Sequence, residues 1–381
     1  MNAPHFATFP KTMIARALHQ VQDAGLTALV LCAFRRPLRE GLLSRLTPPP
    51  RVHPVAFAGR HHEILGDLYL PSDGRPHAGL ILVHGLNESG KDDPRIGWLG
   101  RLLARVGFIV LAPDFPGFRS LRVRQADVGD LVDTFRSLAS LTPRVRPERI
   151  GLMGFSYGAG PMLIAATDPA IRSQVRFVVS LGGYYDLGAV IRFITTGHFQ
   201  HREHRGQIPP NPHARWLFLG YNLDLLRAEE DRRILGEIAA ARATGGSENL
   251  SPRVDALTLW GRAFYDLLTN KDPARVEALI QRLDPLILAE IAGLSPSRVL
   301  GDLRADLVVI HGVQDDFIPY TESLRLAEAI PDKGRVRLAI TRLLTHMDLT
   351  PPPTRWRLLT LYLPEAIRIA WVVRYAIAQR R

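Results

Sequence analysis

The chain has 381 residues, enough to form one large hydrophobic core or two smaller ones. Its composition, 46% hydrophobic and 22% charged, is that of a globular protein and excludes a disordered chain. The 48 Lys and Arg residues exceed the 37 Asp and Glu residues, which gives a net charge of +11. The arginines are scattered and form no dense basic run, so we expect solvated surface charge and no nucleic-acid partner.

Cysteine content and hydropathy predict the compartment. The single cysteine, Cys32, excludes an internal disulfide and a cysteine-based metal site. Residues 1–20 lack the early apolar region of a signal peptide. No apolar stretch reaches the roughly 18 uninterrupted residues that suggest a transmembrane helix. We therefore expect a cytoplasmic protein.

The first half of the chain predicts an α/β architecture. Residues 1–50 are expected to form an N-terminal helical extension that ends at the stiff TPPP break. Residues 51–186 are expected to form the first part of the core. Short, almost wholly apolar strands that alternate with helices indicate a parallel sheet covered on both faces. Strands are predicted at 52–59, 62–71, 79–85, 107–114, 149–156 and 177–186.

The alternation is interrupted between residues 187 and 298, where the sequence is helical and loop-like. It resumes with strands in 305–316 and 334–346, so residues 299–381 are expected to complete the core. An insertion at this place predicts a helical cap over one end of the sheet. The predicted fold class is therefore α/β, with a mostly parallel central sheet, helices on both faces and a helical cap insertion.

The C-terminal segment from Arg355 to Arg381 is strongly apolar, with spaced arginines and an interruption at Pro364. We expect a closing helix that packs on the sheet, with its last arginines complementing the helix dipole. The alternative is an interfacial helix in peripheral contact with a membrane, although the arginines do not collect on one clear face.

The loop LVHGLNESGKDD, residues 82–93, fits two different sites. Gly85, Gly90 and Lys91 match most of a phosphate-binding P-loop. The same loop starts with His-Gly after an apolar strand, as the oxyanion loop of a serine hydrolase does. Asp92 stands where the P-loop needs Ser or Thr, and neighbouring carboxylates would repel phosphates. Because Asp93-Pro94 also starts the next helix several residues too late, the sequence favours the oxyanion loop.

The segment Gly154-Phe155-Ser156-Tyr157-Gly158 is a G-x-S-x-G motif at a strand-to-helix junction. In such a motif the serine occupies a sharp, strained turn, so that its hydroxyl projects above the sheet. The two glycines let strand and helix approach without Cβ clashes. Ser156 is therefore the candidate nucleophile.

A serine hydroxyl needs a histidine base that is oriented by a carboxylate. Asp315 follows an apolar strand and precedes Ile318-Pro319, and His346 follows the next strand. The order Ser156, Asp315, His346 is the order expected when each partner lies on the loop after a successive strand.

These motifs resemble those of α/β-hydrolase-fold serine hydrolases, in particular dienelactone hydrolase-like proteins and bacterial acyl esterases. By this resemblance Ser156 is the nucleophile, Asp315 the triad acid and His346 the base. Dienelactone hydrolases use cysteine at the position of Ser156, so their substrate is not implied. The resemblance covers residues 55–186 and 299–350 and is carried by HG (84–85), DFPG (114–117), GFSYG (154–158), GVQDDFIP (312–319) and THMDL (345–349).

The predicted activity is hydrolysis of a small-molecule carboxylic ester through an acyl-enzyme, without a metal or organic cofactor. The backbone N–H groups of Tyr157 and Leu86 are the expected oxyanion donors, with Asn87 as the alternative to Leu86. The same machinery also fits a serine peptidase, an amidase or a thioesterase. A catalytically idle member of the fold that serves as a binding or membrane-surface protein is a further alternative.

Several other polar residues are alternative acids or are expected to have structural roles. Asp316 and Asp186 are alternatives for the acid, and Asp348 is expected to be solvated or to cap a helix. His84 and His311 end strands and are expected to be hydrogen-bonded structural histidines. The HREH stretch at 201–204, with His198 and His213 nearby, matches neither zinc motif; a solvated loop is expected, with a zinc site as the alternative.

Overall fold

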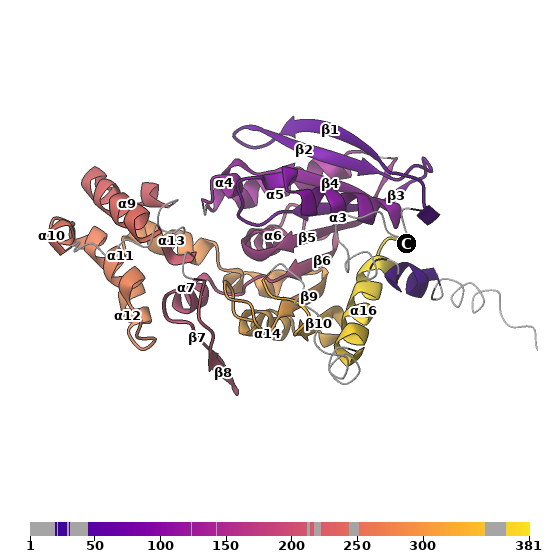
Figure 1. The fold of residues 1–381 in the computed structure, drawn as a ribbon. Helices are drawn as coiled ribbons and strands as arrows, with labels where there is room; N and C mark the ends of the chain where they lie inside the picture. Colours follow the sequence, from indigo (N-terminus) through magenta and orange to yellow (C-terminus); the bar gives the residue numbers. More distant parts are fainter. Residues whose placement is uncertain are drawn as a thin grey trace, which may run out of the picture.

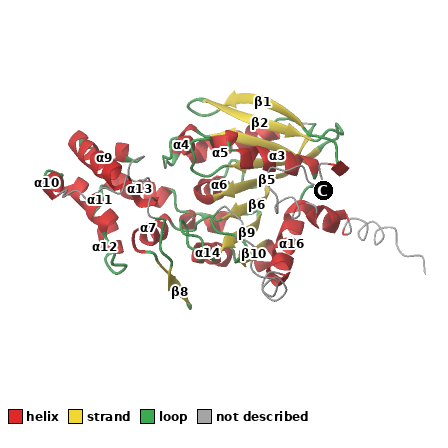
Figure 2. Ribbon diagram, viewed as in Figure 1, coloured by secondary structure: helices red, strands yellow, loops and turns green. Residues whose placement is uncertain are grey.

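The structure, a computed structural model, describes residues 20, 22–28, 30, 45–122, 124–141, 143–211, 214–216, 222–243, 251–346 and 363–381. A central sheet of eight strands carries helices on both of its faces (Figures 1 and 2). The predicted α/β fold class is confirmed.

The central sheet is mostly parallel, as predicted. Its strands lie in the order β1-β2-β4-β3-β5-β6-β9-β10, and only β2 runs in the opposite direction, because it pairs antiparallel with both β1 and β4. Every residue of β4 and of β9 is buried, which explains their continuous apolar sequences. The strands are β1 (Arg51–Ala58), β2 (Glu63–Leu70), β3 (His77–Val83), β4 (Phe108–Asp114), β5 (Val145–Phe155), β6 (Val175–Leu181), β9 (Asp306–Gly312) and β10 (Val336–Thr341).

Two hydrophobic clusters fill the space between the sheet and its helices. On one face Leu99 and Val372 pack against the strands, from α3 (Pro94–Arg105) and α16 (Leu363–Ala378). On the other face Phe135, Met162 and Leu326 belong to α5 (Ala126–Ala139), α6 (Ala159–Ala165) and α14 (Thr321–Ala329). The short elements of this part are α4 (Pro116–Arg119), η1 (Gly90–Asp92), η2 (Ser156–Gly158), η4 (Pro296–Arg298), η5 (Leu300–Asp302) and η6 (Lys333–Arg335).

The segment between β6 and β9 extends beyond one end of the sheet (Figure 1). It is largely helical, as predicted, and its role as a cap stays a prediction. Its elements are α7 (Leu187–Thr196), β7 (His198–His201), β8 (His204–Gln207), η3 (Leu223–Leu225), α9 (Glu229–Ala243), α10 (Ser251–Val254), α11 (Leu259–Thr269), α12 (Val276–Ile280) and α13 (Pro285–Gly293).

The stretch at residues 201–204, predicted as a solvated loop, contains an exposed turn, but the two short strands that this turn joins were not predicted. The stretch forms an antiparallel hairpin in which β7 pairs with β8 from His198↔Gln207 to His201↔His204. The turn places Arg202 at a φ of 53°. Phe199 anchors the hairpin, with its ring centroid 5.4 Å from that of Tyr320. Main-chain pairing and the contact between these two half-buried rings therefore overcome the polar composition.

The two ends of the described chain pack together. Most of residues 1–50 lie outside the described residues, as does Cys32, but residues 22–28 are helical. Asp23 Oδ1 lies 2.6 Å from Arg380 Nη1, and both side chains are buried. Val30 belongs to the hydrophobic cluster in which α16 packs against the strands. The predicted packing of the closing helix on the sheet is therefore found. Within the described parts of the chain, no helix combines the length and apolarity needed to cross a membrane.

The buried Asp23–Arg380 pair predicts a measurable contribution to stability. Asp23→Ala leaves the Arg380 guanidinium buried without its carboxylate, so we expect the free energy of unfolding to fall by about 3 kcal/mol. The double variant Asp23→Ala/Arg380→Met should recover part of this loss. Urea unfolding curves measure both effects, with the exposed Glu203→Ala as control. A loss below about 0.5 kcal/mol, typical of surface substitutions, would contradict the pairing.

Candidate active site

Ser156 occupies the sharp turn between β5 and α6. Its φ of 50° lies in the left-handed region, which is costly for a residue with a side chain. A Cβ on Gly158 would stand 2.2 Å from the carbonyl oxygen of His84, and one on Gly154 would stand 2.9 Å from Cα of Ala159. Both glycines of the motif are therefore required by close backbone approach, as the sequence predicts.

The structure brings the predicted nucleophile, base and acid together. Ser156 Oγ lies 2.7 Å from His346 Nε2, and His346 Nδ1 lies 2.7 Å from Asp315 Oδ2. Asp315 follows β9 and His346 follows β10, and these neighbouring parallel strands end at the same edge of the sheet. Three side chains that are far apart in the sequence thus form one chain of hydrogen bonds.

Asp315 is fully buried and acts as an acceptor only. Its Oδ1 accepts hydrogen bonds from the backbone N–H groups of Phe317 and Ile318, both at 2.9 Å. Burial alone would raise the pKa of Asp315, but the charge and hydrogen bonds of His346 and His311 hold it well below its usual range. Because the carboxylate has no proton to give, His346 Nδ1–H donates to it and Nε2 is left to accept from the Ser156 hydroxyl.

His311 forms a second contact with Asp315 that the sequence analysis did not predict. Its Nε2 lies 2.9 Å from the carbonyl oxygen of Ile318 and 3.3 Å from Asp315 Oδ2. Both of these are acceptors, so Nε2 carries a proton and donates. Its Nδ1, 2.6 Å from Ser323 Oγ, accepts from that hydroxyl in the neutral imidazole. The spacing of four residues between His311 and Asp315 at the end of β9 was the available signal.

The loop after β3 lies directly against the turn that carries Ser156. A Cβ on Gly85 would stand 3.3 Å from both the carbonyl oxygen of Phe155 and Cβ of Ser156. The Leu86 N–H donates no hydrogen bond to any residue that the structure describes. Tyr157 N–H belongs to the first turn of η2, where backbone donors lack partners within the helix. Leu86 and Tyr157 remain the predicted oxyanion donors.

The remainder of this loop lacks the features of a phosphate site. Asp93 caps α3 by accepting from Arg95 N–H at 2.8 Å, and Pro94 is the first helical residue, as predicted. Lys91 Nζ lies 2.7 Å from Asp92 Oδ1 and 3.3 Å from Asp67 Oδ2. The lysine of the P-loop-like sequence is thus engaged with two carboxylates.

Among the described residues, neither alternative acid is hydrogen-bonded to His346. Asp186 caps α7 by accepting from Ala189 N–H at 3.0 Å, and its other oxygen accepts from Ser297 Oγ at 3.1 Å. Asp316 accepts from Asn211 N–H through its backbone carbonyl. Asp348 lies outside the described residues.

Three other histidines near the strand ends and the hairpin are held by hydrogen bonds. Nδ1 of His84 lies 2.8 Å from the carbonyl oxygen of Gly85, and burial lowers the pKa of this side chain. Nδ1 of His198 lies 3.0 Å from the carbonyl oxygen of Thr196, and Nε2 of His201 lies 3.0 Å from Glu328 Oε2. Among the described residues, which exclude His213, no group of three or more His, Cys, Asp or Glu side chains fits a metal ion.

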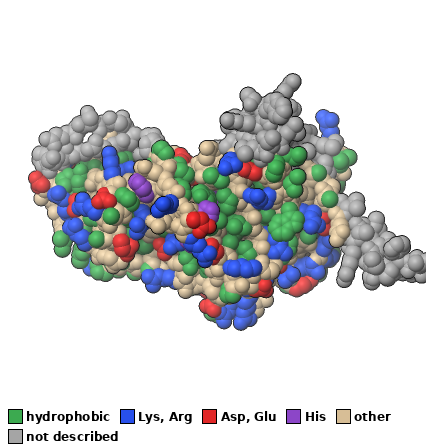
Figure 3. Space-filling model, turned by 90° about the horizontal axis from the view of Figure 1, so that it is seen from below, with side chains coloured by type: hydrophobic (Ala, Val, Ile, Leu, Met, Phe, Trp, Pro, Cys, Tyr) green, Lys and Arg blue, Asp and Glu red, His purple; other side chains and the backbone are tan. Residues whose placement is uncertain are grey.

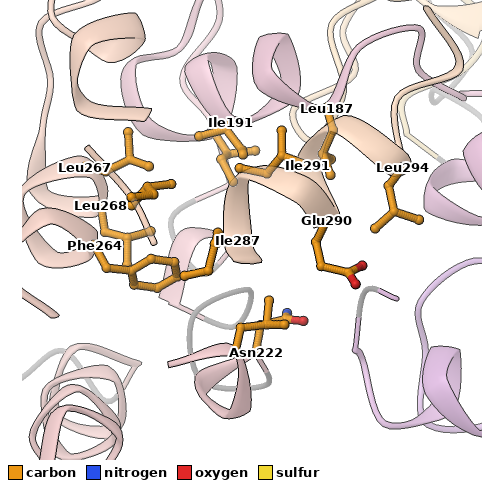
Figure 4. A pocket seen from close by; sticks show the side chains of 13 residues that line it. Leu187, Ile191, Asn222, Phe264, Leu267, Leu268, Ile287, Glu290, Ile291 and Leu294 are labelled. Carbon is orange, nitrogen blue, oxygen red and sulfur yellow. The ribbon is translucent and has the colours of Figure 1, made fainter. Parts of the chain in front are cut away.

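An aromatic layer lies behind the turn of Ser156. The Tyr157 ring stacks on Tyr184 at a centroid distance of 6.1 Å, and Tyr184 OH donates to the carbonyl oxygen of Leu294 at 3.0 Å. Leu294 also lines a small apolar pocket, into which Phe264 and Ile287 point (Figure 4). The pocket lies between α7, α11 and α13. The aromatic layer thus connects the turn of Ser156 to the core of the inserted segment.

Asp127 is a buried carboxyl group in the same region. Its Oδ2 and the hydroxyl of Tyr157 have no hydrogen-bond partner in the described protein. Burial, and next the charge of Asp130, raise the pKa of Asp127 to about 7. Asp127 is therefore a carboxyl that folding keeps protonated up to near-neutral pH.

Comparison with known proteins places this chain in a recognised family. The model of the Alpha/beta hydrolase family matches residues 80–339. Two Mycobacterium tuberculosis proteins described as putative phosphoribosyl transferases are each 30% identical over 179 residues, 45% of this chain and 39% of theirs. The chain therefore spans well under half of these curated relatives. A non-reducing polyketide synthase of Preussia isomera is 23% identical over 305 residues, 71% of this chain and 11% of the synthase.

The solved structures that the chain resembles include an esterase, a peptidase and a dienelactone hydrolase. A Pyrobaculum calidifontis esterase is 16% identical with a TM-score of 0.48, over 97% of this chain and 94% of that one. Pyrococcus horikoshii acylaminoacyl peptidase is 15% identical with a TM-score of 0.49, over 88% of this chain and 42% of that one. A dienelactone hydrolase from Anabaena variabilis is 14% identical with a TM-score of 0.43, over 86% of this chain and 96% of that one. These similarities assign no substrate.

The raised pKa of Asp127 predicts a pH-dependent stability. Its folded-state pKa of about 7 exceeds that of an unfolded Asp, about 3.9, so stability falls as pH rises between these values. Asp127→Asn removes this loss. We expect the gain in unfolding free energy of Asp127→Asn over wild type to grow from pH 5 to pH 8 by at most about 3 kcal/mol, because only about two pH units of this window lie below the folded-state pKa.

Unfolding curves at both pH values measure this gain, and the exposed Asp255→Asn serves as the matched control. If Asp127→Asn and wild type kept the same difference in stability at pH 5 and pH 8, the carboxyl of Asp127 would not be protonated in the folded protein.

Proposed function

The chain belongs to the alpha/beta hydrolase family, and from this premise we propose that it is a serine hydrolase that cleaves a small-molecule carboxylic ester. One observation carries the proposal. Ser156 Oγ and Asp315 Oδ2 lie on opposite sides of the His346 imidazole, each 2.7 Å from one of its nitrogens. This arrangement can remove a proton from a serine hydroxyl at neutral pH.

The proposed reaction has two halves. His346 Nε2 takes the proton of Ser156 as Oγ attacks the ester carbonyl, and the carbonyl oxygen becomes negative. The N–H groups of Leu86 and Tyr157 are proposed to hold that oxygen. His346 then gives its proton to the departing alcohol, which leaves an acyl-Ser156 ester. In the second half His346 deprotonates a water molecule that attacks this ester. His346 then returns the proton to Ser156 Oγ as the acyl–oxygen bond breaks, which releases the acid and the free Ser156 hydroxyl.

Asp315 supports this proton transfer without taking the proton itself. Its carboxylate fixes the ring of His346 through the 2.7 Å hydrogen bond and stabilises the imidazolium that forms during attack. The Phe317 ring, with its centroid 4.8 Å from that of His346, covers one side of the imidazole. Limited water access strengthens the interaction between the carboxylate and the imidazolium.

We assign His311 as a positioning residue for Asp315. A carboxylate in a fully buried site needs donors for its lone pairs, and three groups besides His346 approach it: two backbone N–H groups and His311 Nε2. The backbone donors bond to Oδ1, whereas His311 lies 3.3 Å from Oδ2, the same oxygen that His346 contacts. His311 therefore lowers the basicity of Oδ2, the oxygen that accepts the hydrogen bond from His346 Nδ1–H.

The segment of residues 187–298 is proposed to act as the cap that excludes water and selects the substrate. The aromatic layer that joins Tyr157 to Tyr184 and Leu294 supports this role, because it links the segment to the turn of the nucleophile. A peptidase, amidase or thioesterase would use the same three side chains, and a non-catalytic binding protein would use none of them.

Substrate assays on Ser156→Ala test the proposed activity. Wild type should hydrolyse p-nitrophenyl esters faster than peptide amides or acyl thioesters, and Ser156→Ala should lower kcat by about a thousandfold or more. Ser140→Ala, which removes an exposed hydroxyl, is the control and should keep full activity. Preference for amides or thioesters would change the substrate class, whereas activity that survives in Ser156→Ala would contradict the mechanism.

Substitution of His311 should alter the pH dependence of the reaction. His311→Phe removes the donor to Asp315 Oδ2, so the Asp315 carboxylate becomes more basic and stabilises the His346 imidazolium more strongly. The acid limb of the kcat/KM profile should therefore move to higher pH. Loss of a hydrogen bond to a charged group, about 1.5–3 kcal/mol, corresponds to roughly ten- to hundredfold lower activity.

His311→Gln, which keeps an N–H donor, is the matched variant and should recover part of the activity and of the pH profile. Unfolding curves of both variants separate a loss of folded protein from a catalytic effect. An acid limb at the same pH in wild type and His311→Phe would show that His311 serves stability alone.

A further inference from the structure

The outward side of α16 carries a row of exposed apolar side chains. Leu363, Ile367 and Trp371 are 52%, 60% and 47% exposed. They are spaced by four residues, so they lie next to one another along one side of the helix. Val372 points in nearly the opposite direction and is fully buried against the sheet. The row therefore faces away from the core, which is unusual for large apolar residues gathered on one element.

The charged groups beside this row are mostly arginines. The guanidinium of Arg337 lies 5.1 Å from the centre of the Trp371 ring, and Arg368 and Arg374 belong to α16 itself. The acidic residue of α16, Glu365, is turned inward, where it accepts from Thr341 Oγ1 at 2.9 Å. On the face seen from below, hydrophobic side chains gather where α16 lies, with Lys and Arg around them (Figure 3). The exposed face thus combines an apolar row with positive charge.

We propose that this face of α16 docks on the surface of an anionic lipid bilayer. Leu363, Ile367 and Trp371 would enter the headgroup region, where tryptophan is favoured because one end of its ring is apolar and the other polar. The arginines would contact lipid phosphates, to which guanidinium groups bind through paired hydrogen bonds. Because α16 packs on β10 along its opposite side, it would lie in the plane of the bilayer surface and insert only its exposed side chains.

A protein partner fits this face less well. A stable protein–protein interface buries about 800 Å² on each side, and three partly exposed side chains on one helix supply much less than that. A second copy of this chain would also bring its own net charge of +11 to the same contact. A bilayer needs only a few inserted side chains and offers the opposite charge. The inference does not rest on the proposed function, since α16 supplies none of the groups of the reaction.

Vesicle co-sedimentation of the full chain tests the inference. Phosphatidylcholine vesicles that contain phosphatidylglycerol should bind the protein, and pure phosphatidylcholine vesicles should bind it at least about tenfold more weakly. The double variant Ile367→Ser/Trp371→Ser should lose about tenfold or more in binding to the anionic vesicles. The control Leu259→Ser/Leu286→Ser removes two leucines that are 75% and 54% exposed elsewhere, and it should bind like wild type.

Three results would overturn the inference. The first is no binding of wild type to anionic vesicles, and the second is equal binding of wild type and the α16 double variant. The third is a change of molecular mass in light scattering when Ile367 and Trp371 are replaced, because the face would then join two protein copies. A second variant, Leu363→Ser/Ile367→Ser, and an unfolding curve for each protein show whether lost binding reflects lost folding.

Discussion

The candidate active site depends on one chain of hydrogen bonds, from Ser156 through His346 to Asp315. Its members follow β5, β10 and β9, and they meet because parallel strands of one sheet end at the same edge. Asp315 is held at both of its carboxylate oxygens: the backbone N–H groups of residues 317 and 318 donate to one, and His311 lies against the other. An ionised carboxyl can therefore remain in a fully buried position, where an unpaired charge would be very costly.

The backbone around Ser156 is as constrained as its side-chain partners. A φ of 50° is unfavourable for serine, and it persists because Gly154 and Gly158 allow α6 and the loop after β3 to lie against the turn. The same close approach brings Gly85 to within contact of Ser156. Strain, close packing and preformed hydrogen bonds all concentrate at one edge of the sheet. They leave the serine hydroxyl oriented toward the base before any substrate arrives.

Much of this architecture could be predicted from the sequence, because its signals are local. Apolar runs located the strands, and the spacing around Ser156 and Asp315 located residues that the structure brings together. The hairpin formed by β7 and β8 was not predictable, because its polar sequence hides a pairing anchored by Phe199. The contact between Asp23 and Arg380 joins the two ends of the chain and has no local signal. His311 has a local signal, but its contact with Asp315 depends on how the loop after β9 folds back.

The account is tested most directly by a crystal structure of the protein after reaction with a phosphonate ester. We predict a covalent bond from phosphorus to Ser156 Oγ. The phosphoryl oxygen should lie within hydrogen-bonding distance of the Leu86 and Tyr157 N–H groups, and His346 should remain bonded to Asp315. An adduct on another residue, or a His346 ring turned away from both Ser156 and Asp315, would contradict the account.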